Sequence, residues 1–245
     1  MFPIRDHNPA SRTPFITLLL IAANALVFLL MLPALDDARA LSAILGSYAL
    51  IPAEFTAGED RWTLLTSMFL HGGFWHIAGN LLFLWIFGDN LEDQMGHPGF
   101  LVFYLATGAA GGIAQVLADP TSPVATVGAS GAIAGVMGGY LLMFPRARVD
   151  LLIVIVFFVR IVSLPAWAML GYWFILQLLS GLAADLSQGG VAYWAHAGGF
   201  AAGLALTLPA WWRRGGADFW EQTGGRPPHP SVPLRASRIP RVPRR

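Results

Sequence analysis

The sequence predicts an all-α membrane protein, a bundle of six transmembrane helices with the N- and C-termini in the cytoplasm. Two observations predict this fold class. Of the 245 residues, 56% are hydrophobic and only 12% are charged, about half the charged fraction of an ordinary soluble domain. The charged residues are also absent in blocks, and the blocks approach the length of about 20 residues that a helix needs to cross a bilayer.

Six runs without charged residues are candidates for these spans. They are Phe15–Leu32, Phe74–Gly88, Phe100–Leu117, Val127–Phe144, Leu164–Ala184 and Val191–Trp212. The chain therefore divides into an N-terminal cytoplasmic tail (1–13), a membrane domain (14–212) and a C-terminal cytoplasmic tail (213–245). Because the last segment is rich in Arg and Pro, it has little apolar surface to bury and is expected to be disordered.

One further apolar segment does not fit a span. Leu151–Val159 lies between Asp150 and Arg160, and nine residues make only about 14 Å of helix. The segment is therefore interpreted as an interfacial piece, a re-entrant piece or a short buried strand. The sequence leaves the form of residues 145–163 open among these three.

The distribution of Arg orients the bundle, because basic residues near span ends mark the cytoplasmic side. Eight of the 15 basic residues lie in 213–245, and Arg146 and Arg148 follow the fourth run. The loop 33–73 is acidic on balance. Six spans place both Arg-rich segments inside and this loop outside. We expect a multi-pass protein of a bacterial inner membrane, surrounded by the lipid bilayer and without a nucleic-acid partner; the oligomeric state is not indicated.

Polar side chains at membrane depth are functional candidates, because burying them in lipid costs free energy. His76 and Asn80 lie four residues apart on one face of the second span, Ser130 begins the fourth span and His196 begins the sixth. Spans two, four and six all enter from the outer side. His76, Ser130 and His196 should therefore lie at one shallow depth.

Small residues indicate that the fourth and sixth spans pack closely. Gly131, Gly135 and Gly139 repeat every fourth residue in one span, and Gly199 and Gly203 have the same spacing in the other. Such faces let helix backbones approach each other. The glycines are interpreted as packing residues, and this packing would bring Ser130 within reach of His196.

This arrangement predicts nucleophilic catalysis. A serine hydroxyl becomes a nucleophile when a neighbouring base takes its proton, and His is suited to that role. The oxyanion would be stabilised by the backbone N–H of Ser130 and by His76 and Asn80, and Gly128 would let a substrate backbone approach. The spans contain no carboxylate, so the prediction is a Ser130–His196 dyad. Taken singly, each residue has a plain alternative as a packing or hydrogen-bonding group.

Three motifs resemble those of the rhomboid intramembrane serine proteases. They are Phe69–Asn80 (FLHGGFWHIAGN), Gly128–Gly131 (GASG) and Ala195–Gly199 (AHAGG). The order, spacing and six-span plan match over about residues 14–212. The resemblance implies a protease that cleaves transmembrane segments of other membrane proteins, with Ser130 as nucleophile, His196 as base, and His76 and Asn80 in the oxyanion hole. It also implies lateral access of substrate beside the fifth span, around Trp167, Trp173 and Phe174.

The sequence departs from this family at two places. Many members carry Trp-Arg in the first outer loop, whereas Trp62 is followed here by Thr63. Some members place an aromatic ring four residues after the nucleophile, against the catalytic His, and that position is Ala134 here. The sequence therefore leaves open which group orients His196.

The remaining polar residues and loops have other interpretations. His71, in the outer loop, is interpreted as a structural hydrogen-bonding residue, and neither a metal nor another cofactor is expected. Residues 185–190 are either a lid over the site or a plain connector. The alternative functions are a non-catalytic rhomboid-like protein that binds client helices, and a transporter or channel. The presence of both Ser130 and His196 argues against the first, and the absence of ionisable residues at mid-membrane depth argues against the second.

Overall fold

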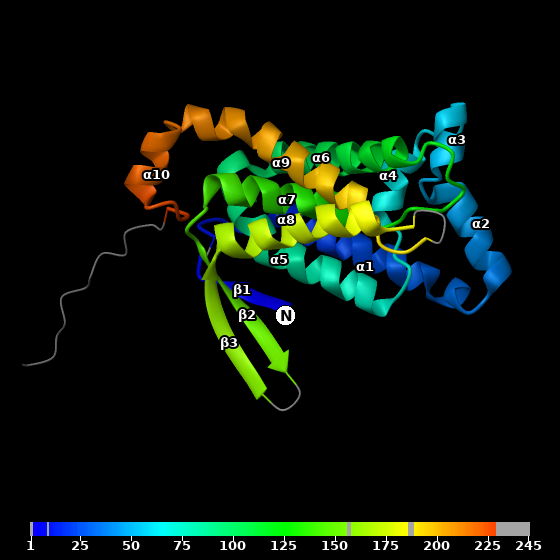
Figure 1. Ribbon diagram of the computed structural model, residues 1–245, viewed down its shortest axis with the longest axis horizontal. Coiled ribbons are helices and arrows are strands. Elements are labelled where there is room, and N and C mark those ends of the chain that lie inside the picture. Colours follow the sequence, from blue (N-terminus) through cyan, green and yellow to red (C-terminus); the bar gives the residue numbers. More distant parts are fainter. Residues whose placement is uncertain (1, 9, 156–157, 186–188, 229–245) are drawn as a thin grey trace, which may run out of the picture.

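The computed structural model describes residues 2–8, 10–155, 158–185 and 189–228, and long helices lying side by side dominate it (Figure 1). These helices are α1 (Phe15–Leu35), α5 (Phe74–Met95), α6 (His97–Ala118), α7 (Ser130–Met143), α8 (Ala166–Ala183) and α9 (Tyr193–Arg213). Each corresponds to one predicted run. By length and composition α1, α6 and α8 could cross a membrane, and α7 is a shorter apolar helix.

Helix α7 forms the centre of the bundle. Every residue from Gly131 to Tyr140 is buried, as expected for a helix that is apolar on all sides. Helices α1 and α8 instead expose large apolar side chains, among them Leu30 and Leu182. The structure thus has a buried helix that carries Ser130 and outer helices whose apolar faces suit contact with lipid.

Helices α7 and α9 meet backbone to backbone, as the glycine spacing predicted. A Cβ atom on Gly199 would lie 2.0 Å from the carbonyl oxygen of Gly131, and one on Gly203 would lie 2.0 Å from that of Gly135. Only glycine permits this separation. The close approach fixes the N-terminal ends of α7 and α9 beside each other, which is where Ser130 and His196 lie.

The predicted outer loop contains short helices at one end of the bundle (Figure 1). They are α2 (Ala38–Tyr48), α3 (Pro52–Ala57), α4 (Thr63–Thr66) and the 3₁₀ helix η1 (Ser67–Phe69). Asp37 begins α2 by accepting hydrogen bonds from the N–H groups of Arg39 and Ala40, a standard N-cap interaction.

The expectation of a purely helical fold was wrong at the opposite end of the bundle. Strands β1 (Phe2–Asp6), β2 (Arg148–Ile155) and β3 (Phe158–Pro165) form an antiparallel sheet in that order (Figure 1). The apolar segment 151–159 is too short to span, and its β-branched residues favour a strand. Of the three forms left open, a strand is observed, but it is not buried throughout, since Val154 is 55% and Val159 63% exposed. Residues 156–157 lie outside the described part.

Asp150 on β2 links β1 to the hairpin formed by β2 and β3. Its buried carboxylate accepts a hydrogen bond from Ser163, pairs with Arg5 Nε at 2.8 Å and lies 2.7 Å from His7 Nε2. The hydroxyl of Ser163, with His7 and Arg5, holds the pKa of Asp150 well below its usual range. The first residues of the predicted N-terminal tail are therefore part of the sheet.

Helix α5 extends beyond its predicted end at Gly88 to Met95 because its acidic residues have partners. The buried carboxylate of Glu92 accepts hydrogen bonds from the N–H groups of Ile16 and Thr17, at 2.9 and 2.8 Å, and from the Thr17 hydroxyl at 2.7 Å. It thereby satisfies the free N–H groups at the start of α1. Glu92, four residues beyond the predicted end of the run, therefore joins α5 to α1.

Part of the segment after residue 213, where the composition predicted disorder, is helical. Helix α10 (Ala217–Thr223) buries Phe219, and Trp220 Nε1 donates a 2.9 Å hydrogen bond to the carbonyl oxygen of Leu142. Two aromatic side chains thus supply the apolar surface that the Arg- and Pro-rich composition concealed. The rest of the predicted tail, 229–245, lies outside the described residues.

Candidate active site

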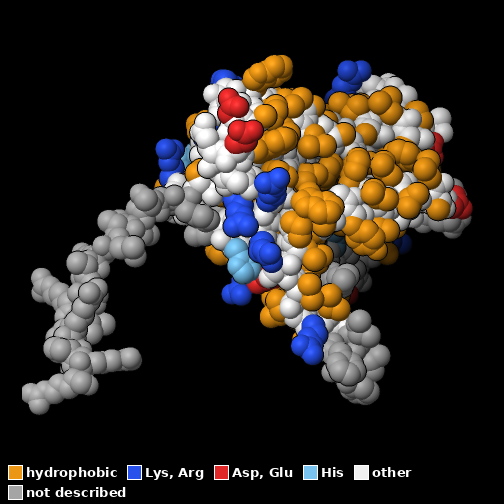
Figure 2. Space-filling model, turned by 60° about the vertical axis from the view of Figure 1, so that its left-hand side comes forward, with side chains coloured by type: hydrophobic (Ala, Val, Ile, Leu, Met, Phe, Trp, Pro, Cys, Tyr) orange, Lys and Arg blue, Asp and Glu red, His pale blue; other side chains and the backbone are white. Residues whose placement is uncertain are grey.

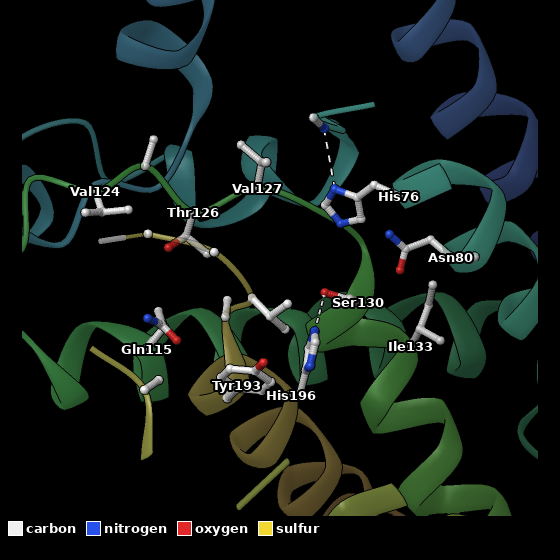
Figure 3. A pocket seen from close by; sticks show the side chains of 18 of the residues that line it. His76, Asn80, Gln115, Val124, Thr126, Val127, Ser130, Ile133, Tyr193 and His196 are labelled. Carbon is white, nitrogen blue, oxygen red and sulfur yellow. Dashed lines mark hydrogen bonds between the residues drawn. The ribbon is translucent and has the colours of Figure 1, made fainter. Parts of the chain in front are cut away.

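Ser130 is the first residue of α7, and the segment before it is held in place by backbone hydrogen bonds. Thr126 and Leu50 exchange both of their backbone hydrogen bonds, and the N–H of Gly128 donates to Ser67 at 2.9 Å. Gly128 has a φ of +121°, a conformation that side chains other than glycine rarely adopt. The turn at Gly128 directs the chain into α7 and places the Ser130 hydroxyl in a pocket (Figure 3).

His196 lies in the first turn of α9, opposite Ser130. The distance from its Nε2 to Ser130 Oγ is 2.8 Å, and Figure 3 shows the two side chains pointing toward each other. This is the separation of a normal hydrogen bond. Two residues that are 66 positions apart in the sequence are thus in contact, as the common depth and the glycine packing predicted.

A residue that the sequence analysis did not single out contacts the other side of the imidazole. Nδ1 of His196 lies 2.8 Å from Oε1 of Gln177 on α8. An amide oxygen only accepts, so Nδ1 carries the proton and Nε2 is left to accept the hydroxyl proton of Ser130. Gln177 therefore selects the tautomer that a general base requires. The available signal was an amide side chain within the fifth apolar run.

An aromatic ring also lies beside His196, although position 134 holds Ala. The ring of Trp173 on α8 is 5.8 Å from the imidazole, centre to centre, and tilted by 35°. Phe174, one residue on, stacks on Phe200 at 4.5 Å. Of the three residues expected beside the lateral access, Trp173 and Phe174 therefore pack against α9, whereas Trp167 is 59% exposed. Trp173 and Gln177 are the groups that contact the imidazole.

His76 and Asn80, both on α5, face Ser130 from the opposite wall (Figure 3). The Gly72 N–H donates to Nδ1 of His76 at 3.4 Å, so the neutral ring carries its proton on Nε2. A Cβ atom on Gly128 would lie 2.6 Å from that Nε2. Asn80 is buried, and its Nδ2 has no hydrogen-bond partner among the described residues. Two N–H donors are thus held near Ser130.

These side chains line one pocket of about 680 Å³. Gln115, Asp119, Ser122 and Thr126 supply polar groups to it, and Phe83 of α5 and Trp173 of α8 supply aromatic rings. Gly189 and Gly190, from the loop that the sequence interpreted as a lid or a connector, also line the pocket. Residues 186–188 of that loop lie outside the described part of the chain.

His71 has the structural role that its position suggested. The side chain is buried, Nδ1 lies 3.3 Å from the carbonyl oxygen of Phe69, and the ring meets His76 edge-on at 5.1 Å. Burial, with a smaller contribution from His76, lowers the pKa of His71 to about 4. The ring is therefore neutral at pH 7 and supports the wall that holds His76.

Comparison with known families agrees with this geometry. The profile of the Rhomboid domain matches residues 58–213, which run from the outer loop to the last residue of α9. The chain belongs to the rhomboid family. The match includes all three motifs and both faces of the pocket, and together with the apolar helices it indicates an integral membrane protein.

Individual relatives are similar to this rhomboid over parts of its length. YdcA, a rhomboid-family protein of Bacillus subtilis, is 32% identical over 134 residues, which is 49% of this chain and 67% of YdcA. Rhomboid protease GluP of Bacillus subtilis is 36% identical over 128 residues, 52% of this chain and 24% of GluP. Mouse Rhomboid-related protein 2 is 42% identical over 84 residues, 34% of this chain and 26% of that protein. The chain thus spans only about a quarter of two of these three relatives.

Proposed function

We propose that this rhomboid is an intramembrane serine endopeptidase that cleaves transmembrane segments of other membrane proteins. The observation that carries the proposal is the 2.8 Å contact between Ser130 Oγ and His196 Nε2. A protein that only bound client helices would gain nothing from a serine placed at hydrogen-bonding distance from an oriented imidazole. The presence of named proteases among its relatives supports the same conclusion.

The first step is acylation of Ser130. As Oγ attacks the scissile carbonyl carbon, its proton passes to Nε2 of His196, and the imidazolium that forms is stabilised by its hydrogen bond to Gln177. The carbonyl oxygen becomes an oxyanion. When the tetrahedral intermediate collapses, Nε2 returns the proton to the departing amine, and an ester of Ser130 remains.

The oxyanion has donors on both sides. As the first residue of α7, Ser130 has an N–H without an intrahelical partner, and the start of a helix favours negative charge. Nε2 of His76 and Nδ2 of Asn80 approach from α5. Donors that are positioned before the reaction stabilise charge that appears only in the transition state.

Hydrolysis of the ester requires water, and the polar wall of the pocket provides a route for it. Thr126 and Gln115 line the pocket together with Ser130. A water molecule that enters along them is activated by His196 and releases the acyl group. Substrate helices approach instead from the bilayer, between α5 and α8, where the apolar side chains of Phe83 and Trp173 border the pocket.

We infer that six helices cross the membrane and that both termini lie in the cytoplasm. The basic side chains gather at the end of the molecule that holds the sheet and α10 (Figure 2), which favours the cytoplasmic side. Ser130 then lies near the outer face. We place the protein in a bacterial inner membrane, which agrees with its similarity to Bacillus subtilis proteins.

Labelling of the purified protein with a fluorophosphonate probe tests the proposal. Such probes modify activated serines, so the wild type should be labelled and Ser130→Ala should not. Ser122→Ala is the matched control, because Ser122 lines the same pocket without contacting an imidazole, and it should be labelled like the wild type. Equal labelling of Ser130→Ala and the wild type would contradict the proposal.

Gln177→Leu is expected to lower kcat/KM for a transmembrane reporter by about tenfold to a hundredfold. A hydrogen bond to a charged group contributes roughly 1.5–3 kcal/mol, and each 1.36 kcal/mol is a factor of ten in rate. Gln177→Glu should restore much of the rate. It should also move the acidic limb of the pH–rate profile to higher pH, because a carboxylate stabilises the imidazolium. A purely structural role for Gln177 would leave that limb unmoved.

Gly128→Ala is expected to reduce cleavage at least tenfold. Alanine at position 128 would have to adopt an unfavourable φ, and its Cβ would lie 2.6 Å from Nε2 of His76. The His76 ring, which donates to the oxyanion, must therefore move. Gly72→Ala is the control, because its Cβ would contact the same ring only at 4.0 Å. Reporter cleavage by the two variants measures the difference, and equal rates would exclude this role of Gly128.

A further inference from the structure

A second pocket lies at the other end of the bundle from Ser130. It has a volume of about 490 Å³ and runs between α6 and α9, with Val102, Ala106 and Leu206 on its apolar walls and Arg213 and Arg214 at its rim. Arg213 is 17 positions beyond His196 along α9, or about 25 Å at the rise of an α-helix. The proposed proteolysis makes no use of this groove.

Each of the two arginines has more N–H groups than hydrogen-bond partners among the described residues. Arg214 Nη2 donates to the carbonyl oxygen of Gln94 at 2.8 Å, and Arg213 Nε donates to that of Pro209 at 3.2 Å. A guanidinium has five N–H groups. Neither residue has a carboxylate within ion-pair distance among the described residues. The rim therefore presents two positive charges with free donors, held in position by backbone carbonyls.

The apolar part of the groove faces outward from the bundle. The side chain of Val102 is 67% exposed and that of Leu206 is 48% exposed. In a membrane-embedded helix pair, such side chains meet hydrocarbon rather than water. Gly99 leaves the floor open, since a Cβ atom there would meet only Met95 at 3.5 Å. The groove thus joins an apolar channel to a basic rim.

We propose that this groove binds an anionic phospholipid, with the phosphate between Arg213 and Arg214 and an acyl chain between α6 and α9. Planar guanidinium groups match phosphate oxygens, and basic pockets between helices at a membrane surface suit anionic head groups. A soluble phosphate would use the rim and leave the apolar channel empty. A partner helix would cover the channel and leave two cations unpaired. The proposal does not depend on proteolysis.

Native mass spectrometry of the full chain, released from detergent micelles, tests this site. The protein is titrated with phosphatidylglycerol, with phosphatidylcholine of the same acyl chains, and with glycerol 3-phosphate. We expect one phosphatidylglycerol to be retained in preference to phosphatidylcholine. The doubly substituted Arg213→Gln/Arg214→Gln variant should bind it about thirtyfold more weakly, given roughly 1 kcal/mol for each Arg near a membrane surface.

Two further variants separate the site from general charge effects. Arg160→Gln/Arg226→Gln removes the same charge from exposed positions outside the groove and should bind lipid like the wild type. Gly99→Leu keeps both arginines and fills the floor, and it should lose the bound lipid. Equal loss in both charge variants would overturn the proposal. So would displacement of the lipid by glycerol 3-phosphate, or a dimer that Gly99→Leu abolishes.

Discussion

Replacing Ser130 by Ala is expected to lower kcat/KM for a transmembrane reporter by a factor of about 10³ or more, and His196→Ala should do the same. General-base catalysis alone accounts for about 10²–10⁴, and loss of the nucleophile removes the acyl-enzyme route altogether. In the proposed mechanism the two residues act as one unit through the 2.8 Å contact, so the double variant should be no slower than either single variant. Additive losses would show that they act separately.

The measurement is reporter cleavage by purified variants in vesicles, with thermal unfolding as a check on folding. Ser130 is only partly buried and bonds to His196 alone among the described side chains, so its truncation should leave the melting temperature almost unchanged. Ser122→Ala serves again as the control for removal of a pocket hydroxyl. Undiminished cleavage by Ser130→Ala would remove the basis of the proposed function.

The arrangement of Ser130 and His196 could be predicted from the sequence because three separate rules agree on it. Arg placement predicts the orientation of the bundle, that orientation predicts one depth for both residues, and glycines at four-residue spacing bring their helices together. The structure adds the reason that this agreement is specific: Gly199 and Gly203 contact the backbone of α7 directly. A common depth alone does not determine which faces of the two helices meet, so it would not bring the two side chains into contact.

Gln177 could not be predicted as a site residue because the same rules apply only to residues near the outer ends of the spans. It lies in the middle of α8, and it reaches His196 because α8 packs beside α9 at that level. Trp173 is a similar case, since its ring replaces from another helix what Ala134 lacks. Contacts between helices depend on rotation about each axis, which apolar composition does not encode.

The sheet was missed for a related reason. Charged residues were used to delimit apolar runs, and Arg160 therefore ended the segment that begins at Leu151. In the structure Arg160 lies within β3, paired with Ile153, and Asp150 lies within β2 because Arg5, His7 and Ser163 satisfy its carboxylate. A charge marks the edge of a membrane segment, but it does not end a strand outside the membrane.

The second large effect is expected at Gly199, far from any reacting atom. Gly199→Ala would place a Cβ 2.0 Å from the carbonyl oxygen of Gly131 and 2.8 Å from its carbon. Both atoms belong to the backbone of α7, so no side chain can move aside and the two helices must separate. Overpacking of a tight core costs about 1–3 kcal/mol of folding free energy. We expect a clash with backbone atoms to cost at least the upper value of this range.

Gly171→Ala provides a matched control, because it is the same substitution within α8 at a position where a Cβ would meet nothing within 4 Å. Alanine is the better helix former by about 1 kcal/mol, so Gly171→Ala should raise the midpoint of unfolding while Gly199→Ala lowers it. Gly199→Ala should also lose more cleavage than its unfolded fraction explains, because Gly131 follows Ser130 directly and any separation of α7 from α9 lengthens the contact between Ser130 and His196. If both variants unfolded at the same midpoint, the backbone contact would not be what holds these two residues together.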